Sequence, residues 1–178
     1  MQQRKDIVMN RLRLVSLIGV LTLAACDQEH DLRTQRNIQL VERFHGEVWS
    51  DGNVDLLDEM LGDNYVKHWA AYGPTVGKDA LKAHIDRWRA SFPDWNERID
   101  AIEASGDMVF TRWTETGTFV NDFAGMKANG NTVKIGGMGW FRFENDIIVE
   151  EWTIIDNWGS QIQLDVTYPE RWLNPAWK

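Results

Sequence analysis

The chain has 178 residues, of which 27 are acidic and 19 basic, so its formal net charge at pH 7 is −8. This negative excess argues against nucleic acid and against an anionic lipid surface as binding partners. The single cysteine, Cys26, leaves no partner for a disulfide and no set of thiolates for a metal site. Ten tryptophans in a chain of this length favour a cavity lined by aromatic rings.

The first 26 residues have the pattern of a secretory signal peptide. The segment opens with four basic residues, Arg4, Lys5, Arg11 and Arg13. The apolar run that follows, 14–23, is too short to span a bilayer as a helix. Leu-Ala-Ala-Cys at 23–26 resembles the bacterial lipobox, which implies cleavage before Cys26 and lipid on its sulfur.

We therefore expect residues 1–25 to be removed, 26–34 to form a tether, and 35–165 to form one domain, followed by a Trp- and Pro-rich tail over 166–178. Without residues 1–25 the chain keeps 15 basic and 26 acidic side chains. The protein would be exported and lipid-anchored, at the periplasmic face of a bacterial membrane or at the cell surface. Two alternatives stay open: a plain export signal with an incidental cysteine, and a true start at Met9.

Three helices are predicted before Pro93. The first, 35–50, has apolar residues at helical spacing, and the second runs from Asn53 to residue 60 or 61. The third, 78–92, is ended by Pro93. Residues 64–69 are predicted as a short extended segment between the second helix and the third.

Beyond Pro93 the apolar residues alternate with a period of two, which predicts strands at 97–105, 108–119, 132–143 and 147–156. A short helix at 159–165 follows. Gly136, Gly137 and Gly139 indicate a bulge or a sharply curved sheet. Helices followed by such strands predict an α+β fold in which a cone-shaped, curved antiparallel sheet packs on the N-terminal helices.

Six segments resemble the SnoaL-like polyketide cyclases, or ester cyclases, of the nuclear-transport-factor-2-like fold. They are Val48–Asn53 (VWSDGN), Asn64–His68 (NYVKH), Ser91–Trp95 (SFPDW), Ser105–Val109 (SGDMV), Trp113–Thr118 (WTETGT), and Glu150–Trp152 followed by Asp156. The resemblance covers about residues 37–164. It implies an intramolecular aldol condensation that needs neither metal nor organic cofactor.

The resemblance also implies site residues. Asp156 corresponds to the acid/base on the last strand, and His68 to the histidine after the Tyr-Val pair, which would polarise a carbonyl. Phe119 stands where many relatives have histidine, and this departure favours a second reading, a non-catalytic binding or interaction lipoprotein. Relatives pair through the open sheet face, so a homodimer is expected.

The residues themselves leave alternatives open at each position. Alternation places Asp156 beside Trp152 and Ile154, whose apolar side chains would desolvate the carboxyl, but Asp156 could equally cap the following helix. His68 could equally be a rim histidine bound by the main chain. His45 and His84 are predicted to be ordinary surface or packing residues, and Glu115 and Glu150 are alternative pocket acids, each more often a solvated strand residue.

We predict a pocket for a small hydrophobic ligand. Its expected lining is Trp49, Trp88, Trp113, Phe119, Met138, Trp140 and Trp152. The spacing of the four histidines does not suggest a metal site, and no metal is expected.

Overall fold

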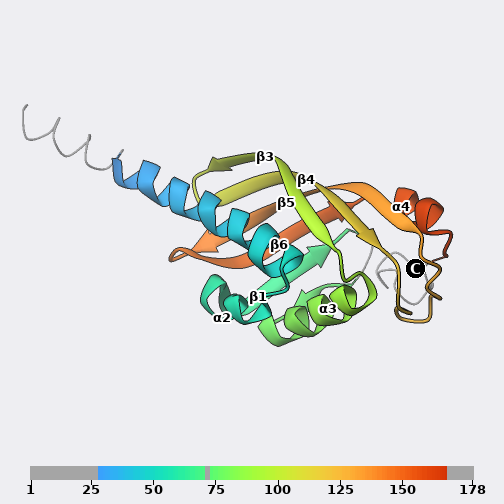
Figure 1. Cartoon of the computed structure of the whole chain (residues 1–178). Helices are drawn as coiled ribbons and strands as arrows, with labels where there is room; N and C mark the ends of the chain where they lie inside the picture. The colour runs from blue at the N-terminus through green and yellow to red at the C-terminus, as the bar shows by residue number, and fades with distance from the viewer. Residues whose placement is uncertain (1–27, 71–72, 168–178) are drawn as a thin grey trace, which may run out of the picture.

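The computed structural model describes residues 28–70 and 73–167. The helices that precede the third strand lie against one side of a sheet, and the last helix lies at the end of the sheet, as Figure 1 shows. A helix over 28–43 continues into the π-helical η1 (Phe44–Ser50), followed by η2 (Val54–Leu56), α2 (Leu57–Met60), α3 (Lys78–Ser91) and, after the last strand, α4 (Asn157–Leu164). Among these described segments, no helix is long and apolar enough to cross a membrane.

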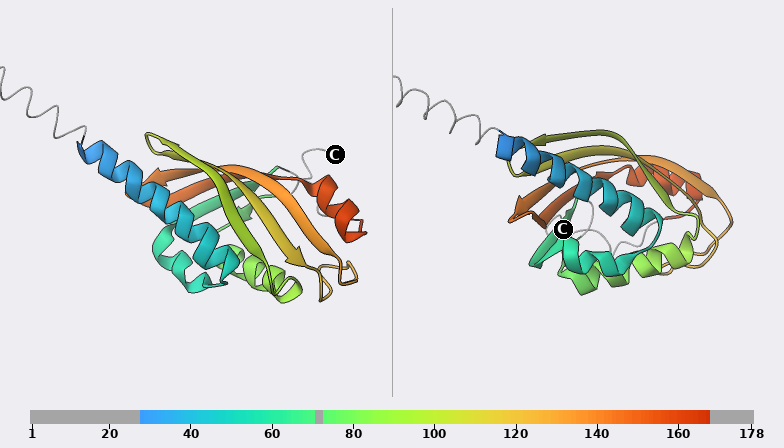
Figure 2. Two further views of the ribbon diagram at one scale, coloured as in Figure 1. Left: turned by 45° about the horizontal axis from the view of Figure 1, so that its top comes forward. Right: turned by 60° about the vertical axis from the view of Figure 1, so that its left-hand side comes forward.

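Six strands form one curved sheet in the order β2-β1-β6-β5-β4-β3. They are β1 (Leu61–Trp69), β2 (Thr75–Val76), β3 (Asn96–Ser105), β4 (Met108–Thr118), β5 (Thr132–Glu144) and β6 (Ile147–Ile155). The expected α+β architecture, with helices packed on a curved sheet, is confirmed (Figure 2). One detail differs from the expectation: β1 pairs with β6 in parallel, whereas the other neighbouring strands are antiparallel.

The N-terminal helix begins earlier than expected, because residues 28–34, predicted as a tether, are already helical. These turns are largely exposed and lie beyond the sheet (Figure 1). At the other end the helix widens into η1, where the amide of Asp51 donates to the carbonyl of Gly46, five residues back. The wider turn brings Phe44, His45, Val48 and Trp49 to the buried side together.

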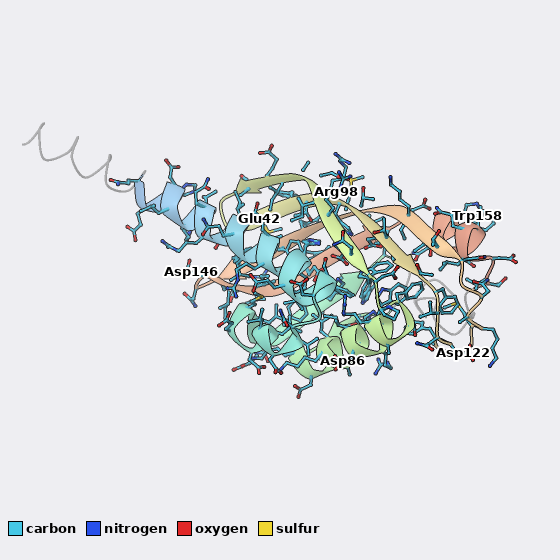
Figure 3. The ribbon with its side chains drawn as sticks, in the orientation of Figure 1. Glu42, Asp86, Arg98, Asp122, Asp146 and Trp158 are labelled. Atoms are coloured by element: carbon cyan, nitrogen blue, oxygen red, sulfur yellow. The ribbon has the colours of Figure 1, made fainter. Side chains whose placement is uncertain are left out.

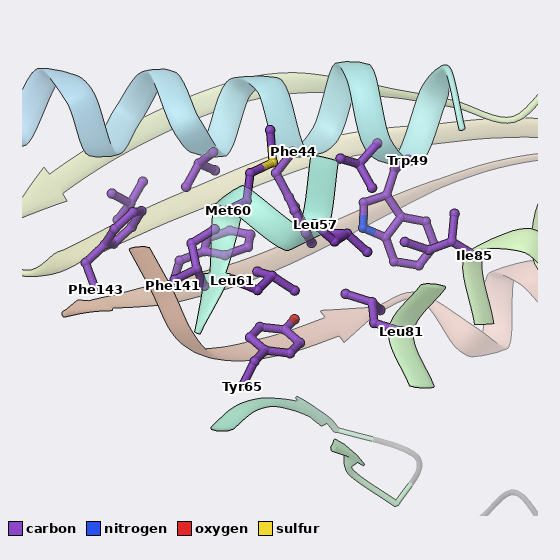
Figure 4. Packing of buried hydrophobic residues seen from close by; sticks show 14 residues of the cluster. Phe44, Trp49, Leu57, Met60, Leu61, Tyr65, Leu81, Ile85, Phe141 and Phe143 are labelled. Carbon is purple, nitrogen blue, oxygen red and sulfur yellow. The ribbon is translucent and has the colours of Figure 1, made fainter. Parts of the chain in front are cut away.

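Two apolar clusters hold the helices to the sheet. The larger cluster joins the N-terminal helix, α2 and α3 to β1, β4, β5 and β6 (Figure 4). Within it Phe44 packs edge-on against Phe141, with the ring centres 5.6 Å apart. The smaller lies at the other end of the sheet, where Phe119 stacks on Phe92 at 5.0 Å. Charged residues such as Glu42 and Asp86 lie on the outer sides of the helices (Figure 3). Between the clusters the inner side of the sheet is left to polar and aromatic residues.

Candidate active site

A cavity of about 700 Å³ lies between the inner face of the sheet, η1 and α3. Five indole rings contribute to its walls, from Trp49, Trp69, Trp88, Trp95 and Trp113. Three of the predicted lining residues are among them: Trp49, Trp88 and Trp113. The size and the aromatic walls suit a small, largely apolar molecule.

Two buried carboxyl groups stand side by side in this cavity. Glu97 on β3 and Glu115 on β4 are register partners, and both side chains face inward. Each accepts a hydrogen bond from the tryptophan two residues earlier: Trp95 Nε1 donates to Glu97 Oε1 at 3.2 Å, and Trp113 Nε1 donates to Glu115 Oε1 at 2.7 Å. Trp113 and Glu115 are two apart in β4 and share a face, so the ring lies beside the acid that it binds. Trp95 directly precedes β3, which begins at Asn96.

The pair holds a proton at neutral pH. Burial and the charge of the adjacent Glu97 carboxylate together raise the pKa of Glu115 from 4.5 to about 8, against the opposing effects of the Trp113 hydrogen bond and the Lys67 charge. Two carboxylates this close in a dry site cannot both ionise cheaply. Glu115 is therefore a carboxylic acid beside a second carboxyl group, an arrangement that can both give and accept a proton.

His45 is attached to the same pair. Its Nδ1 lies 2.6 Å from Glu97 Oε2, and its ring packs against Trp113 at 4.8 Å. With a proton on Nδ1 the imidazole donates to Glu97, while Nε2 is buried and has no hydrogen-bond partner among the described residues. The π-helical turn makes this contact, since it brings His45 to the buried side with Phe44.

A second buried network lies on β1 and β6. Glu151 accepts from Lys67 Nζ at 2.5 Å, from Tyr65 Oη at 2.5 Å and from Thr153 Oγ1 at 2.6 Å. Burial alone would raise the pKa of Glu151, but the Lys67 charge and these hydrogen bonds outweigh it and lower the pKa below its ordinary value. Glu151 is therefore an ionised partner for Lys67.

Glycines make space for the two tryptophan rings that donate hydrogen bonds to Glu97 and Glu115. A Cβ atom at Gly137 would overlap the Trp113 indole, and one at Gly117 would lie 2.7 Å from Trp95 Cε3. The sequence left two alternatives for the glycines of β5, a bulge or a curved sheet. Gly136, Gly137 and Gly139 pair in regular register with β4, so there is no bulge at these positions, and the sheet that contains them is curved (Figure 2). Gly137 and Gly139 leave room for the ring of Trp113.

Four predicted lining residues lie outside this cavity. Phe119 is fully buried in the smaller cluster, stacked on Phe92. Met138, Trp140 and Trp152 are on the outer face of the sheet, where Trp140 stacks beside Trp152 at 6.2 Å and Met138 is 58% exposed.

His68 and Glu150 also lie on the outer face. His68 Nε2 lies 2.8 Å from Glu150 Oε1, and Arg142 Nε donates to Glu150 Oε2 at 2.9 Å. Trp152 covers the imidazole at 5.2 Å. The alternation predicted for the last strand is correct, but the cavity lies on its other side, which carries Glu151 and Thr153.

Asp156 caps a helix and does not face the cavity. Its Oδ1 accepts from the Gly159 amide at 2.7 Å at the start of α4, and the residue is exposed. Of the two roles open to Asp156, the geometry supports the cap.

Several cavity residues were missed or misassigned from the sequence, among them His45, Lys67, His84, Glu97 and Glu151. A repeated spacing could have identified one acid, since Trp-x-Glu occurs at both 95–97 and 113–115. His45 lies four residues from both Val41 and Trp49, on the apolar side of its helix. Across 28–70 and 73–167, no three His, Cys, Asp or Glu side chains are placed to hold a metal ion.

Comparison with known proteins is consistent across the domain. The sequence signature of the SnoaL-like polyketide cyclases matches residues 39–164. Solved structures with the same fold include two proteins assigned as polyketide cyclases. The one from Jannaschia sp. CCS1 is 18% identical with a TM-score of 0.69, and the match covers 76% of this chain and 95% of that one. The one from Acidithiobacillus ferrooxidans is 27% identical with a TM-score of 0.67, and the match covers 73% of this chain and 94% of that one. IdmH from Streptomyces antibioticus, assigned to the same activity, matches at 25% identity and a TM-score of 0.64, over 73% of this chain and 99% of its own. No curated protein matches the sequence.

Replacing Asp156 with Ala should lower the free energy of unfolding by about 1 kcal/mol, because α4 loses its N-cap. Asp156→Asn should keep most of the wild-type stability, because asparagine is also a good N-cap. Urea unfolding would measure the change, and calorimetric titration of an apolar ligand should show unaltered binding in both variants. Weakened binding with unaltered stability would contradict the cap and show that the Asp156 carboxyl acts in ligand binding.

Replacing Glu115 with Gln should make stability less dependent on pH. The folded protein keeps the Glu115 proton up to about pH 8, whereas the unfolded chain loses it near pH 4.5. Wild-type stability should therefore fall relative to the variant as pH rises through this window, by at most about 1.4 kcal/mol per pH unit. Urea unfolding at pH 5, 6.5 and 8 measures the difference, with the exposed Glu103→Gln as control. Parallel profiles for wild type and Glu115→Gln would contradict the assignment.

Proposed function

Because the chain belongs to the SnoaL-like polyketide cyclase family, we propose that it binds a small, largely apolar carbonyl compound in the cavity and moves protons on it, as in a cyclase or isomerase. The observation that carries this proposal is the Glu97–Glu115 pair, in which one carboxyl group keeps its proton among aromatic rings. Such a pair provides an acid and a base within reach of the same bound molecule.

The proposed base is the Glu97 carboxylate, oriented by His45 and Trp95. It takes a proton from the carbon beside a carbonyl. The C–H electron pair becomes a C=C bond, and the carbonyl oxygen takes up the negative charge of an enolate.

The proposed acid is Glu115. In ring closure the enolate carbon attacks a second carbonyl, and Glu115 gives its proton to the new alkoxide. In the isomerisation of an unsaturated ketone the enolate is conjugated with the second C=C bond, and Glu115 gives its proton to the far carbon of this system. The proton on Glu97 then returns to Glu115 on the neighbouring strand, so substrate and product have the same composition.

The second candidate, a binding protein without turnover, was favoured by the phenylalanine at position 119. Phe119 lies in the smaller apolar cluster and not in the cavity, so its apolar side chain removes no polar group from the proposed site. The catalytic proposal is therefore independent of position 119, and the two candidates separate on turnover.

A simple ketone tests the proposal. Wild-type protein should accelerate exchange of the acidic C–H protons of 2-tetralone with D2O, followed by NMR, and Glu97→Gln should slow this exchange about 10²-fold or more. Glu150→Gln, the same change on the outer face, is the control and should keep the wild-type rate. Binding of the ketone with no exchange above buffer would support the binding protein, and equal losses in both variants would refute the role of Glu97.

We also propose that the domain is held outside the cytoplasm by lipid on Cys26. Support comes from the sequence, because an apolar run, Leu-Ala-Ala and the single cysteine meet at this position, which lies outside the described residues. Cys26→Ser should abolish incorporation of a labelled fatty acid and leave the domain folded. Absence of label in the wild type, or equal label in the variant, would contradict the anchor.

A further inference from the structure

Lys67 brings an incompletely paired ammonium group to the cavity wall. An ammonium has three N–H donors. One donates to Glu151 Oε1, and no other acceptor for Lys67 lies within the part of the chain that the structure describes. Its Nζ instead lies 4.2 Å from the centre of the Trp69 ring and 4.9 Å from that of Trp49. The remaining donors are available to a ligand oxygen.

His84 on α3 lies next to it. Its ring is within 6.5 Å, centre to centre, of four aromatic rings, those of Trp49, Trp69, Trp88 and Phe123. No hydrogen bond joins His84 to any other described residue. Burial lowers the pKa of His84 to about 4, helped by the charges of Lys67 and Arg87. At neutral pH the imidazole therefore offers one N–H donor and one bare nitrogen.

Glu151 does not cancel the effect of Lys67 within the cavity. Its carboxylate is only 1% exposed and is also bound by Tyr65 and Thr153. The positive charge of Lys67 lowers the pKa of both His84 and Glu115, so it extends to both sides of the cavity. The ammonium is therefore the end of the pair that a ligand would meet.

We infer that Lys67 and His84 form a binding site for an oxygen that takes up negative charge when the ligand loses a proton. The ligand is then an apolar molecule with an enol, a phenol or an enolisable ketone. The link to catalysis rests on the proposed function: when Glu97 removes the proton, the negative charge develops on the oxygen held here. Preorganised donors at such an oxygen stabilise the charge as it forms.

The ionisation of bound 4-nitrophenol tests this site, because phenol and phenolate differ in colour. Wild-type protein should favour the bound phenolate by about tenfold or more relative to buffer. Lys67→Met alone would leave Glu151 buried without its cation and could unfold the chain. The double variant Lys67→Met/Glu151→Gln removes both charges and should abolish the shift. Lys82→Met, on the same helix as His84 but paired with Asp58 at the surface, is the control and should keep it.

Several outcomes would overturn the inference: no binding of the probe, no shift towards phenolate, or a shift that survives in the double variant. The measurement needs no turnover, so it separates from the proposed function. A shift that depends on Lys67, found without exchange of the ketone protons, would support the oxygen site and contradict the proposed catalysis. Exchange of the ketone protons without the shift towards phenolate would support the catalysis and contradict the oxygen site.

Discussion

The hydrogen bonds from Trp95 and Trp113 to the carboxyl groups of Glu97 and Glu115 are the interactions on which the cavity depends. A carboxyl group out of water is costly unless a donor binds it. Here the donor is the N–H of a ring that also forms the wall, so one side chain both excludes water and satisfies the acid. Adjacent strands repeat the arrangement in register, which brings the two acids together and leaves them with a proton to share.

The rest of the inner face follows from the same constraint. Two polar contacts at the cavity join different elements: His45 from η1 binds Glu97 on β3, and Lys67 from β1 binds Glu151 on β6. These contacts link segments far apart in the sequence. Helix, sheet and site are therefore stabilised together, and the widened turn at η1 is part of this arrangement.

The sequence predicted the elements well and the cavity only in part. Helical and alternating periodicities located the helices and strands, and alternation on β6 separated Glu150 from Glu151 correctly. Alternation does not say which face is enclosed. Trp152 and Ile154 suggested an interior, yet they lie on the open face, while the enclosed face carries Glu151 and Thr153. Partners such as Lys67 and Tyr65 make that polar face stable, and they are more than 80 residues away in the chain.

The glycines under the tryptophans have a consequence for recognising related proteins. Trp113 on β4 lies opposite Gly137 on β5, and Gly139 lies opposite Thr111. A Cβ atom at Gly137 would overlap the indole of Trp113, and one at Gly139 would press on the same ring. The orientation of the acid therefore depends on residues that have no functional group of their own. A Trp-x-Glu pattern whose tryptophan lies opposite the first glycine of a Gly-x-Gly would mark the chains that keep this proton more reliably than a comparison of their acidic residues alone.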